Sequence, residues 1–472
     1  MNVRLLPLAL SLLLLAGCTP PPKPAPSSSP APEPQPTPVA GIELDDFLED
    51  INARRRAVIE TETPLDVSAW THDFTEQNST YTEEEMDLLL TPHDLAEPLT
   101  AETAREDVEA FFTLLRTTYG AYEYFGGDEV FGPLEEQALA QLEKEAAGGQ
   151  PLVSQTIQGV LMDTLSPVLR DGHFRIGDQH PLEPYQKYMY YVPDLYLSDA
   201  DGLNPDYVKP TIGPEGQICY GFYALSHDGT DLPDTLGDYD LHWVQAGRGS
   251  QGRDVFTEYS YQGIPVLQST QMYAGTPGQE AQLERFAACG GEYADEPVLI
   301  FDVRANPGGS DIWIMNWFEG FTGQPAEPKR TGGHRYSQLS CRAFSFYPED
   351  GMGTWSVSED PGTWAPSESV TLLLTDKGTA SSGETVVEFF HSMENVLAIG
   401  GPTSGCALVP NNCTFYLPHT GLQVYFGTGL TICETPELVD GRGYLPDLWV
   451  DPWSALDAAA RLCDYYGLTE NA

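Results

Sequence analysis

A serine that could act as a nucleophile stands at residue 381, within the segment 379–384, Thr-Ala-Ser-Ser-Gly-Glu. An apolar run precedes this segment and a helical pattern follows it, so Ser381 is predicted on a tight turn between a strand and a helix. On such a turn the hydroxyl is exposed and backbone N–H groups lie beside it, as covalent catalysis requires. Ser381 and Glu384 also have the spacing of a helix capping box, in which Glu384 orients the turn, and both interpretations can hold together.

A second turn supplies groups that the same chemistry needs. The apolar run 298–303 leads into Asn-Pro-Gly-Gly at 306–309. Two glycines after a proline let backbone N–H groups point into a cleft. One such donor stabilises the oxyanion of acyl transfer by about 3–4 kcal/mol in the transition state. Gly308 or Gly309, together with Ser382, is therefore predicted to form an oxyanion hole, although Pro-Gly-Gly alone is also an ordinary turn.

Together these segments resemble the tail-specific (C-terminal processing) serine peptidase family. Asp-Val-Arg-Ala-Asn-Pro-Gly-Gly at 302–309 is similar to the strand-and-glycine signature of that family, and 379–384 is similar to its nucleophile turn. The segments 399–405 and 440–447 extend the similarity, which spans residues 281–450. The resemblance implies a crotonase/Clp-like α/β core and endopeptidase activity on a peptide or protein substrate, and it implies no metal or organic cofactor.

The base does not follow the better-known branch of this family. In that branch a lysine pairs with the serine, and it follows a turn similar to 400–405. Cys406 occupies that place here. Lys377 precedes Ser381 by four residues and is interpreted as a solvated side chain. A Ser-Lys dyad is therefore not expected.

The tricorn-like branch of the family instead takes its base from a histidine in a segment similar to 169–176, Leu-Arg-Asp-Gly-His-Phe-Arg-Ile. His173 fits that place, and a histidine with a pKa near 6.5 accepts a serine proton at neutral pH. The branch also supplies a late carboxylate that holds the imidazole, and Asp440 matches that position. Asp440 is one methylene shorter than the glutamate of many relatives, so it either contacts His173 or has a purely structural role. Gly172 lacks a hydroxyl that some relatives carry there.

Three regions must position these residues. Apolar residues at three- and four-residue steps predict a helical N-terminal domain over 41–180. Short aromatic and β-branched runs, broken by Gly, Pro and Asp, predict a β-rich middle region over 181–280, in which no PDZ-type peptide-binding loop is clear. Alternating apolar strands and helical stretches predict an α/β catalytic core over 281–472.

The beginning of the chain predicts export and lipid anchoring. Residues 1–17 combine Arg4 with a short apolar run, as in a signal peptide, and end in Leu-Ala-Gly before Cys18. This order resembles the bacterial lipobox, whose cysteine carries the lipid, and an ordinary signal peptide is the alternative. Residues 18–40 are rich in proline and predict a tether that reaches about 60 Å from the membrane. We expect a location in the cell envelope, on the outer face of the cytoplasmic membrane or the periplasmic side of the outer membrane.

The composition narrows the possible partners. The 70 acidic and 23 basic residues give a net charge of −47, which argues against nucleic acid and against direct binding to anionic lipid. The seven cysteines after Cys18 contain no CxxC pair, which argues against a metal site. Cys406 and Cys413 are near enough in sequence to close a small disulfide loop. The sequence leaves the oligomeric state open.

Three hypotheses from different classes follow. The first is a serine endopeptidase that works through an acyl-enzyme, with Ser381 as the nucleophile and His173 as the base. The second is a catalytically weak or inactive relative that binds peptides, which Cys406 and Asp440 motivate. The third is a lipid-anchored solute-binding protein, for which Ser381, the 306–309 turn and His173 would have no reason to occur together.

Overall fold

The computed structural model describes residues 40–469 except 62, 64, 75–80, 94–96, 182–186, 227–231, 233, 237–238, 249–253, 326, 347–350 and 440–441. These residues all belong to one compact unit that spans Val39–Ala472. The predicted signal peptide, Cys18 and most of the predicted tether lie outside the described residues, as does Asp440. Of the helices in the described ranges, none is both long and apolar enough to cross a membrane.

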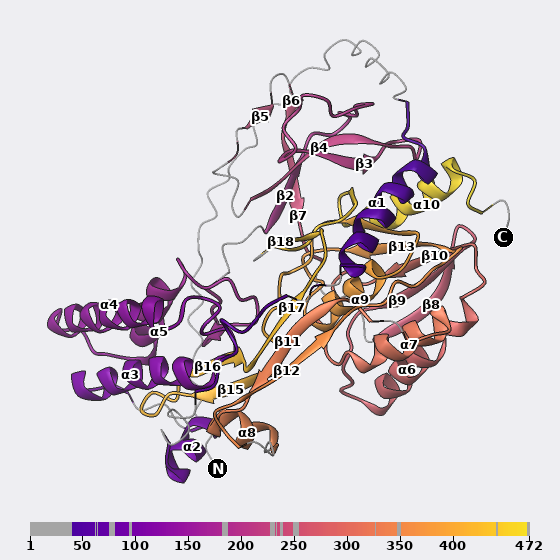
Figure 1. Ribbon diagram of the computed structural model, residues 1–472. Helices are drawn as coiled ribbons and strands as arrows, with labels where there is room; N and C mark the ends of the chain where they lie inside the picture. The colour runs from indigo at the N-terminus through magenta and orange to yellow at the C-terminus, as the bar shows by residue number, and fades with distance from the viewer. Residues whose placement is uncertain are drawn as a thin grey trace, which may run out of the picture. The chain divides into compact units, whose positions relative to one another are not determined.

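A six-stranded sheet forms the centre of the fold. Its order is β20-β14-β13-β10-β9-β8, and neighbouring strands are parallel except for the antiparallel pair β8 and β9. Figure 1 labels β13, β10, β9 and β8 of this sheet. The strands are β8 Phe256–Tyr261, β9 Ile264–Ser269, β10 Val298–Asp302, β13 Val370–Thr375, β14 Val396–Gly400 and β20 Leu448–Trp449. Every residue of β10, β13 and β14 is buried, as expected for parallel strands covered on both faces. The predicted α/β fold is confirmed, and the core sheet continues upstream of residue 281 through β8 and β9.

Helices cover both faces of this sheet (Figure 1). Alternate residues of a strand point to opposite faces, so Phe301 packs with one set of helices and Ile300 with the other. The first set is α6 Pro277–Ala288, α7 Ile312–Thr322 and α9 Ser382–His391. The second set is α1 Leu44–Ile59 and α10 Ala455–Tyr465. The carboxyl ends of β10 and β13 lead into the two turns that the sequence singles out.

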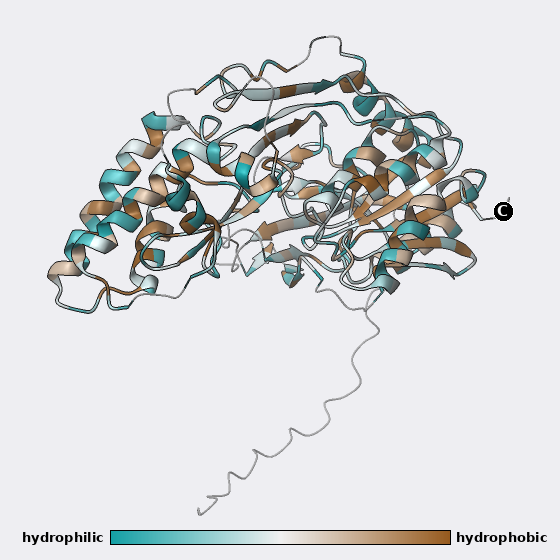
Figure 2. Cartoon of the chain, turned by 90° about the horizontal axis from the view of Figure 1, so that it is seen from below, coloured by the Kyte–Doolittle hydropathy of each residue, from teal (hydrophilic) through white to brown (hydrophobic). Residues whose placement is uncertain are grey.

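The N-terminal helices have a separate apolar core. They are α2 Glu83–Leu90, α3 Ala101–Thr118, α4 Gly127–Ala147 and α5 Ser154–Leu165. The apolar stripe of α3, which includes Val108, Phe111 and Leu115, is buried, as the three- and four-residue spacing predicts, and Figure 2 shows brown apolar residues among the helices. The same core contains residues from β15 Asn412–Tyr416 and β16 Gln423–Gly427. The helical region therefore packs against a late segment of the chain.

The remaining strands form small sheets. One has the order β3-β4-β2-β7, another is the pair β5-β6, and a third has the order β12-β11-β17. Their bounds are β2 Tyr188–Tyr191, β3 Val208–Ile212, β4 Ile218–Ser226, β5 Thr235–Leu236, β6 Tyr239–Asp240, β7 His242–Gln245, β11 Arg330–Arg335, β12 Trp355–Asp360 and β17 Gly429–Cys433. Short elements complete the chain: β1 Arg175–Ile176, the 3-10 helix η2 Gly290–Glu292, α8 Gln338–Phe344, β18 Leu438–Val439 and β19 Gly443–Tyr444.

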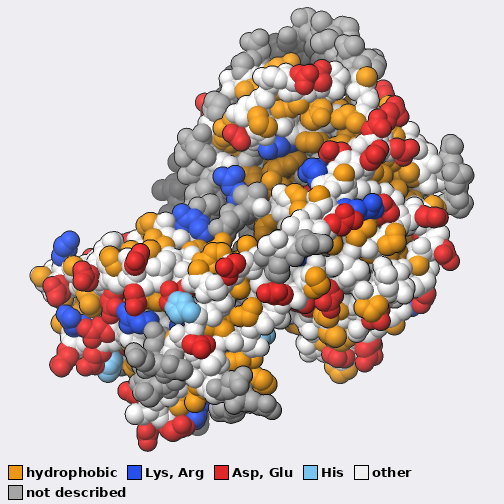
Figure 3. Space-filling view, in the orientation of Figure 1, with side chains coloured by type: hydrophobic (Ala, Val, Ile, Leu, Met, Phe, Trp, Pro, Cys, Tyr) orange, Lys and Arg blue, Asp and Glu red, His pale blue; other side chains and the backbone are white. Residues whose placement is uncertain are grey.

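Two features of composition can be compared with the fold. The seven cysteines from Cys219 to Cys463 are free thiols, so the predicted loop between Cys406 and Cys413 is wrong. Acidic side chains are spread over the face seen in Figure 3, as expected for a solvated surface and not for a single acidic binding patch.

Candidate active site

Ser381 has an unusual backbone conformation for a residue with a side chain. It precedes α9 with φ of 53° and ψ of −126°, in a region that non-glycine residues rarely occupy. Its N–H donates to Oε2 of Glu384 at 3.2 Å, which is the half of the predicted capping box that involves Glu384. A strained serine between a buried strand and a buried helix is a recurrent feature of nucleophile turns.

The glycine turn lies directly against Ser381. Gly308 has φ of 100°, and a Cβ placed on it would lie 2.7 Å from the Cβ of Ser381. The N–H of Gly308 already donates to Oδ1 of Asn306 at 2.9 Å, which leaves it unavailable for a substrate. The N–H groups of Gly309 and of Ser382 take part in none of the backbone and side-chain hydrogen bonds found across the described ranges. Of the predicted donors, these two are free to bind an oxyanion.

Glu384 holds the nucleophile turn and a later turn together. Its buried carboxylate accepts from the Thr403 hydroxyl at 2.5 Å, the Gly405 N–H at 2.7 Å and the Cys406 N–H at 2.6 Å. Burial raises the pKa of Glu384, and these hydrogen bonds act in the opposite direction. With the Ser381 N–H as a further donor, the carboxylate ties both segments at one point.

Lys377 is not the solvated side chain that the sequence predicts. Its Nζ donates to the carbonyls of Thr403 at 2.7 Å, Arg442 at 2.8 Å and Ser404 at 3.4 Å. Burial lowers the pKa of Lys377 to about 8, although the charge of Glu384 opposes that shift. The prediction failed because the three acceptors come from segments that are distant in sequence. Since all three ammonium protons have acceptors, Lys377 is not placed to take a proton from Ser381.

His173 is held in place by a neighbouring acid. The backbone N–H of His173 donates to Oδ1 of Asp171 at 2.8 Å, and the Tyr119 hydroxyl donates to Oδ2 of Asp171 at 2.9 Å. Burial, with a smaller contribution from the charge of Arg175, lowers the pKa of His173 to about 4, although a hydrogen bond with the Val409 backbone opposes the shift. The imidazole is therefore neutral well below the pH of 6–7 that an ordinary histidine would imply. Its Nδ1 is buried and has no hydrogen-bond partner among the described residues.

Cys406 fills the space beside the base. Its Sγ lies 2.3 Å from where a Cβ on Gly172 would be, so any side chain at 172 would collide with the thiol. The thiol contacts the Ser404 hydroxyl at 3.3 Å. Burial raises the pKa of Cys406 to about 12, which keeps the thiol protonated near neutral pH and excludes a thiolate nucleophile. The hydroxyl that is missing at Gly172 would not fit next to this sulfur.

One cavity of about 720 Å³ brings the predicted residues together. Its lining includes Ser381, Ser382, His173, Gly308 and Gly309, together with Cys406. The Ser381 hydroxyl and the His173 ring make no hydrogen bond to each other in the part of the chain that the structure describes. A contact between Asp440 and His173 lies outside the described residues. An unliganded site can be looser than the reacting one, so both groups remain candidates for one proton transfer.

Sequence reasoning missed several residues of this site. The sequence shows Asp171 and Asn306 only as members of the two motifs, whereas in the structure Asp171 accepts from the His173 backbone N–H and Asn306 accepts from the Gly308 N–H. Asp and Asn side chains often accept a hydrogen bond from the backbone N–H two residues later, and this spacing is the signal in the sequence that could identify Asp171 and Asn306. Among the described residues, no group of three or more His, Cys, Asp or Glu side chains could hold a metal ion.

Comparisons with known proteins agree with the motifs. The model of Peptidase family S41 matches residues 267–447, which include both turns. No curated protein matches the sequence.

Several solved structures resemble the chain at low identity. Mature CPAF complexed with lactacystin is 12% identical, with a TM-score of 0.42, 79% of this chain covered and 99% of that chain. The photosystem II D1 C-terminal processing protease is 14% identical, with a TM-score of 0.35, and the match covers 75% of this chain and 94% of that chain. The tricorn protease is 14% identical, with a TM-score of 0.35, and the match covers 78% of this chain and 37% of that chain. These TM-scores add no weight to the family match. The match over residues 267–447 supports a serine-type peptidase of family S41, the tail-specific peptidase family.

Proposed function

We propose that this protein is an exported, lipid-anchored serine endopeptidase in which Ser381 is the nucleophile and His173 is the base. The observation that carries the proposal is the backbone of Ser381, which has φ of 53° at the start of α9 and faces the cavity that His173 also lines. Such strain persists only where the surrounding structure enforces it, and it is concentrated at active sites. Gly309 and Ser382 add two free N–H groups at the same place.

The reaction then follows from what each group can do. The neutral imidazole of His173 takes the proton of the Ser381 hydroxyl, and the resulting alkoxide attacks a peptide carbonyl. The N–H groups of Gly309 and Ser382 bind the oxyanion of the tetrahedral intermediate. The imidazolium returns the proton to the leaving amine, and water releases the acyl group by the reverse sequence. Glu384 orients the turn and does not transfer a proton.

The location is proposed from the beginning of the sequence. Cys18 follows a lipobox-like order, and the proline-rich residues up to 40 would separate the folded unit from the lipid surface. With a net charge of −47, the chain itself would be repelled by anionic headgroups, so the lipid would supply the attachment. The protein would then act on peptides or proteins beside a membrane of the cell envelope.

Labelling with a fluorophosphonate probe tests the nucleophile directly, because the probe reacts only with an activated serine. Wild type should be labelled and should hydrolyse a peptide library, whereas Ser381→Ala should do neither. Ser404→Ala is a matched control, since Ser404 lies on the neighbouring turn and the change removes the hydroxyl that contacts the Cys406 thiol. The backbone hydrogen bonds of Ser404 with Lys377 and Thr379 remain in this variant. Equal labelling of wild type and Ser381→Ala would overturn the assignment.

A second candidate function is peptide binding without turnover. It is favoured by the burial of His173, which lowers the pKa of the imidazole to about 4, because a ring that resists protonation is a poor acceptor for the serine proton. Under this alternative the same cavity would bind a peptide in an extended conformation. Wild type that binds a library peptide in calorimetry, but is neither labelled nor active at any pH, would establish this function in place of the first.

A further inference from the structure

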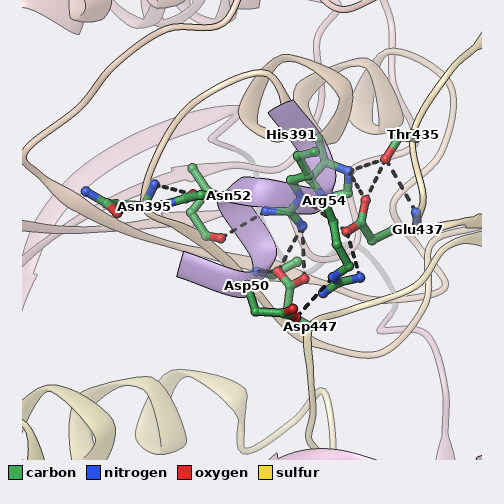
Figure 4. A network of polar contacts seen from close by, with 11 residues as sticks. Asp50, Asn52, Arg54, His391, Asn395, Thr435, Glu437 and Asp447 are labelled. Carbon is green, nitrogen blue, oxygen red and sulfur yellow. Dashed lines mark hydrogen bonds and ion pairs between the residues drawn. The ribbon is translucent and has the colours of Figure 1, made fainter. Parts of the chain in front are cut away.

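The helix nearest to the tether carries a buried arginine that contacts the far end of the chain. Arg55, on α1, is only 2% exposed. Its Nη2 donates to both carboxylate oxygens of Asp447 at 3.0 and 2.9 Å, and its Nε donates to Oε1 of Glu437 at 3.2 Å. Its Nη1 donates to the Val396 carbonyl at 3.0 Å. Figure 4 shows Glu437 and Asp447 close to each other beside this helix.

The two carboxylates lie on either side of a short hairpin. Glu437 directly precedes β18, and Asp447 follows β19 by three residues. One guanidinium therefore holds both ends of the hairpin β18-β19 and attaches them to α1. The planar fork of arginine suits two carboxylates at once, which a lysine ammonium does not.

From the hairpin, hydrogen bonds lead to the nucleophile. The Tyr444 N–H donates to the Thr403 hydroxyl at 2.8 Å, and the Thr403 N–H donates to the Tyr444 carbonyl at 3.0 Å. The Thr403 hydroxyl donates to Glu384, whose carboxylate receives the Ser381 N–H. The Tyr444 hydroxyl also donates to Oε1 of Glu388 at 2.6 Å, and Glu388 lines the cavity of Ser381. Every step of this path is a hydrogen bond between described residues.

We infer that Arg55 is a positioning residue for the reaction, and that it makes the geometry of the nucleophile turn depend on α1. The inference rests on the proposed function. Stability alone gives little reason for this arrangement, since a buried ion pair is commonly no more stabilising than apolar residues of similar volume. What the ion pair does supply is a fixed position for two carboxylates, and hence for the hairpin between them. The helix that follows the tether thereby becomes part of the catalytic apparatus.

Other charged groups around Arg55 leave this assignment unchanged. His391 on α9 faces Glu437, with its Nδ1 3.6 Å from Oε2, and Arg54 reaches Oε1 of Glu437 at 3.8 Å from its half-exposed position. Neither contacts Asp447 in the hydrogen bonds and ion pairs of the described residues. Arg55 is thus the group in this part of the structure that joins both ends of the hairpin.

Arg55→Met in the full chain tests the inference, with Arg56→Met as the matched control. Arg56 is the next residue of α1 and also attaches it to the core, through Glu394 at 2.7 Å, but it does not contact the hairpin. Arg55→Met should lower kcat on a peptide substrate on the order of 10²-fold, because small displacements of a nucleophile have effects of that size. KM should stay within about twofold, since the substrate contacts remain. Arg56→Met should keep both constants within about twofold of wild type.

Two further measurements keep the outcome decisive. If Arg55→Met is not folded by circular dichroism, Glu437→Gln and Asp447→Asn replace it, because each removes one charge and keeps the side-chain shape. Each should lower kcat by about tenfold or more, and wild-type kcat in both would overturn the inference. Hydrogen exchange of the segment 443–447 should accelerate in these variants and not in Arg56→Met. If wild type is inactive but the exchange accelerates in the variants, the proposed function fails and the positioning of the hairpin by Arg55 stands. If wild type is active but the variants keep its exchange rate and its kcat, the role of Arg55 in positioning the hairpin is refuted.

Discussion

Replacing Gly308 by alanine should move the nucleophile without removing any functional group. The new Cβ would lie 2.7 Å from the Ser381 Cβ, 2.7 Å from the Ser382 nitrogen and 2.8 Å from the Ala380 carbonyl oxygen. Ordinary contact begins at 3.4 Å, so the turn that carries Ser381 would have to retreat by about 0.7 Å. Displacements near 1 Å cost on the order of 10²-fold in rate. Gly308→Ala should therefore lower kcat by roughly that factor.

The same substitution also strains the backbone, and a control separates the two effects. A side chain at the φ of 100° of Gly308 costs about 1–3 kcal/mol of folding free energy. Gly323, at the end of α7, also has a positive φ of 69°, but a Cβ there meets nothing within 4 Å. Gly323→Ala should lower the midpoint of thermal unfolding slightly and leave kcat unchanged. Fluorophosphonate labelling rates and peptide hydrolysis measure the effect, and Gly308→Ala with the kcat of wild type would refute the proposed contact between the two turns.

Three further predictions concern the base, the buried lysine and the anchor. His173→Ala should lower kcat by about 10²–10⁴-fold. Wild-type activity should fall as the pH decreases through about 4, because the imidazole becomes protonated there, and a midpoint near 6.5 would contradict the buried position of His173. Lys377→Met should lower kcat by about tenfold, because the ammonium that binds the carbonyls of the 403–404 turn is lost. Wild-type activity should decline above a pH of about 8, where this ammonium loses its proton. Full activity in the variant would show that the turn needs no cation. Cys18→Ala, expressed in a bacterial host, should move the protein from the membrane fraction to soluble or signal-retained forms, and unchanged lipid labelling would exclude Cys18 as the anchor.

Local features of the site could be predicted from the sequence. The turn at Ser381 can be predicted because an apolar strand pattern, small residues and a helical pattern occur within about fifteen positions. Each of these signals depends only on residues that are neighbours in the sequence. The strands β10 and β13 can be predicted for the same reason, since their apolar runs are continuous. The catalytic hypotheses for Ser381 and the 306–309 turn needed only this local information.

The roles of Lys377 and Arg55 could not be predicted, because their partners are distant in sequence. Lys377 donates to carbonyls of Thr403 and Arg442, and backbone carbonyls leave no trace in the residue types. Arg55 binds Glu437 and Asp447, which lie 382 and 392 residues later among many other acids. In a chain with 70 acidic residues, no pattern of charge identifies which two will be buried with one arginine.

The position of His173 depends on a pairing that the sequence also does not reveal. The strand β1 pairs with β16, with Arg175 opposite Tyr425, and this pairing brings the end of the helical region to the cavity of Ser381. The Tyr119 hydroxyl and Asp171 then fix the turn from the other side. Only the resemblance to the tricorn-like branch pointed to His173, because a histidine after Asp-Gly is otherwise an ordinary turn residue.

Cys406 stands where the better-known branch is expected to carry a lysine, so residue 406 supplies no positive charge to balance the carboxylate of Glu384. Glu384 is fully buried, and an isolated buried carboxylate would be strongly disfavoured. Here the hydrogen bonds from Thr403, Gly405 and Cys406 favour the ionised form of Glu384, and the charge of Lys377 adds a smaller effect in the same direction. The cation beside the nucleophile turn is thus retained, but it comes from the residue that enters the turn and not from the residue at 406. Since Lys377 is occupied by carbonyls, it can balance the charge of Glu384 without acting as the base, and proton transfer then requires a different residue such as His173.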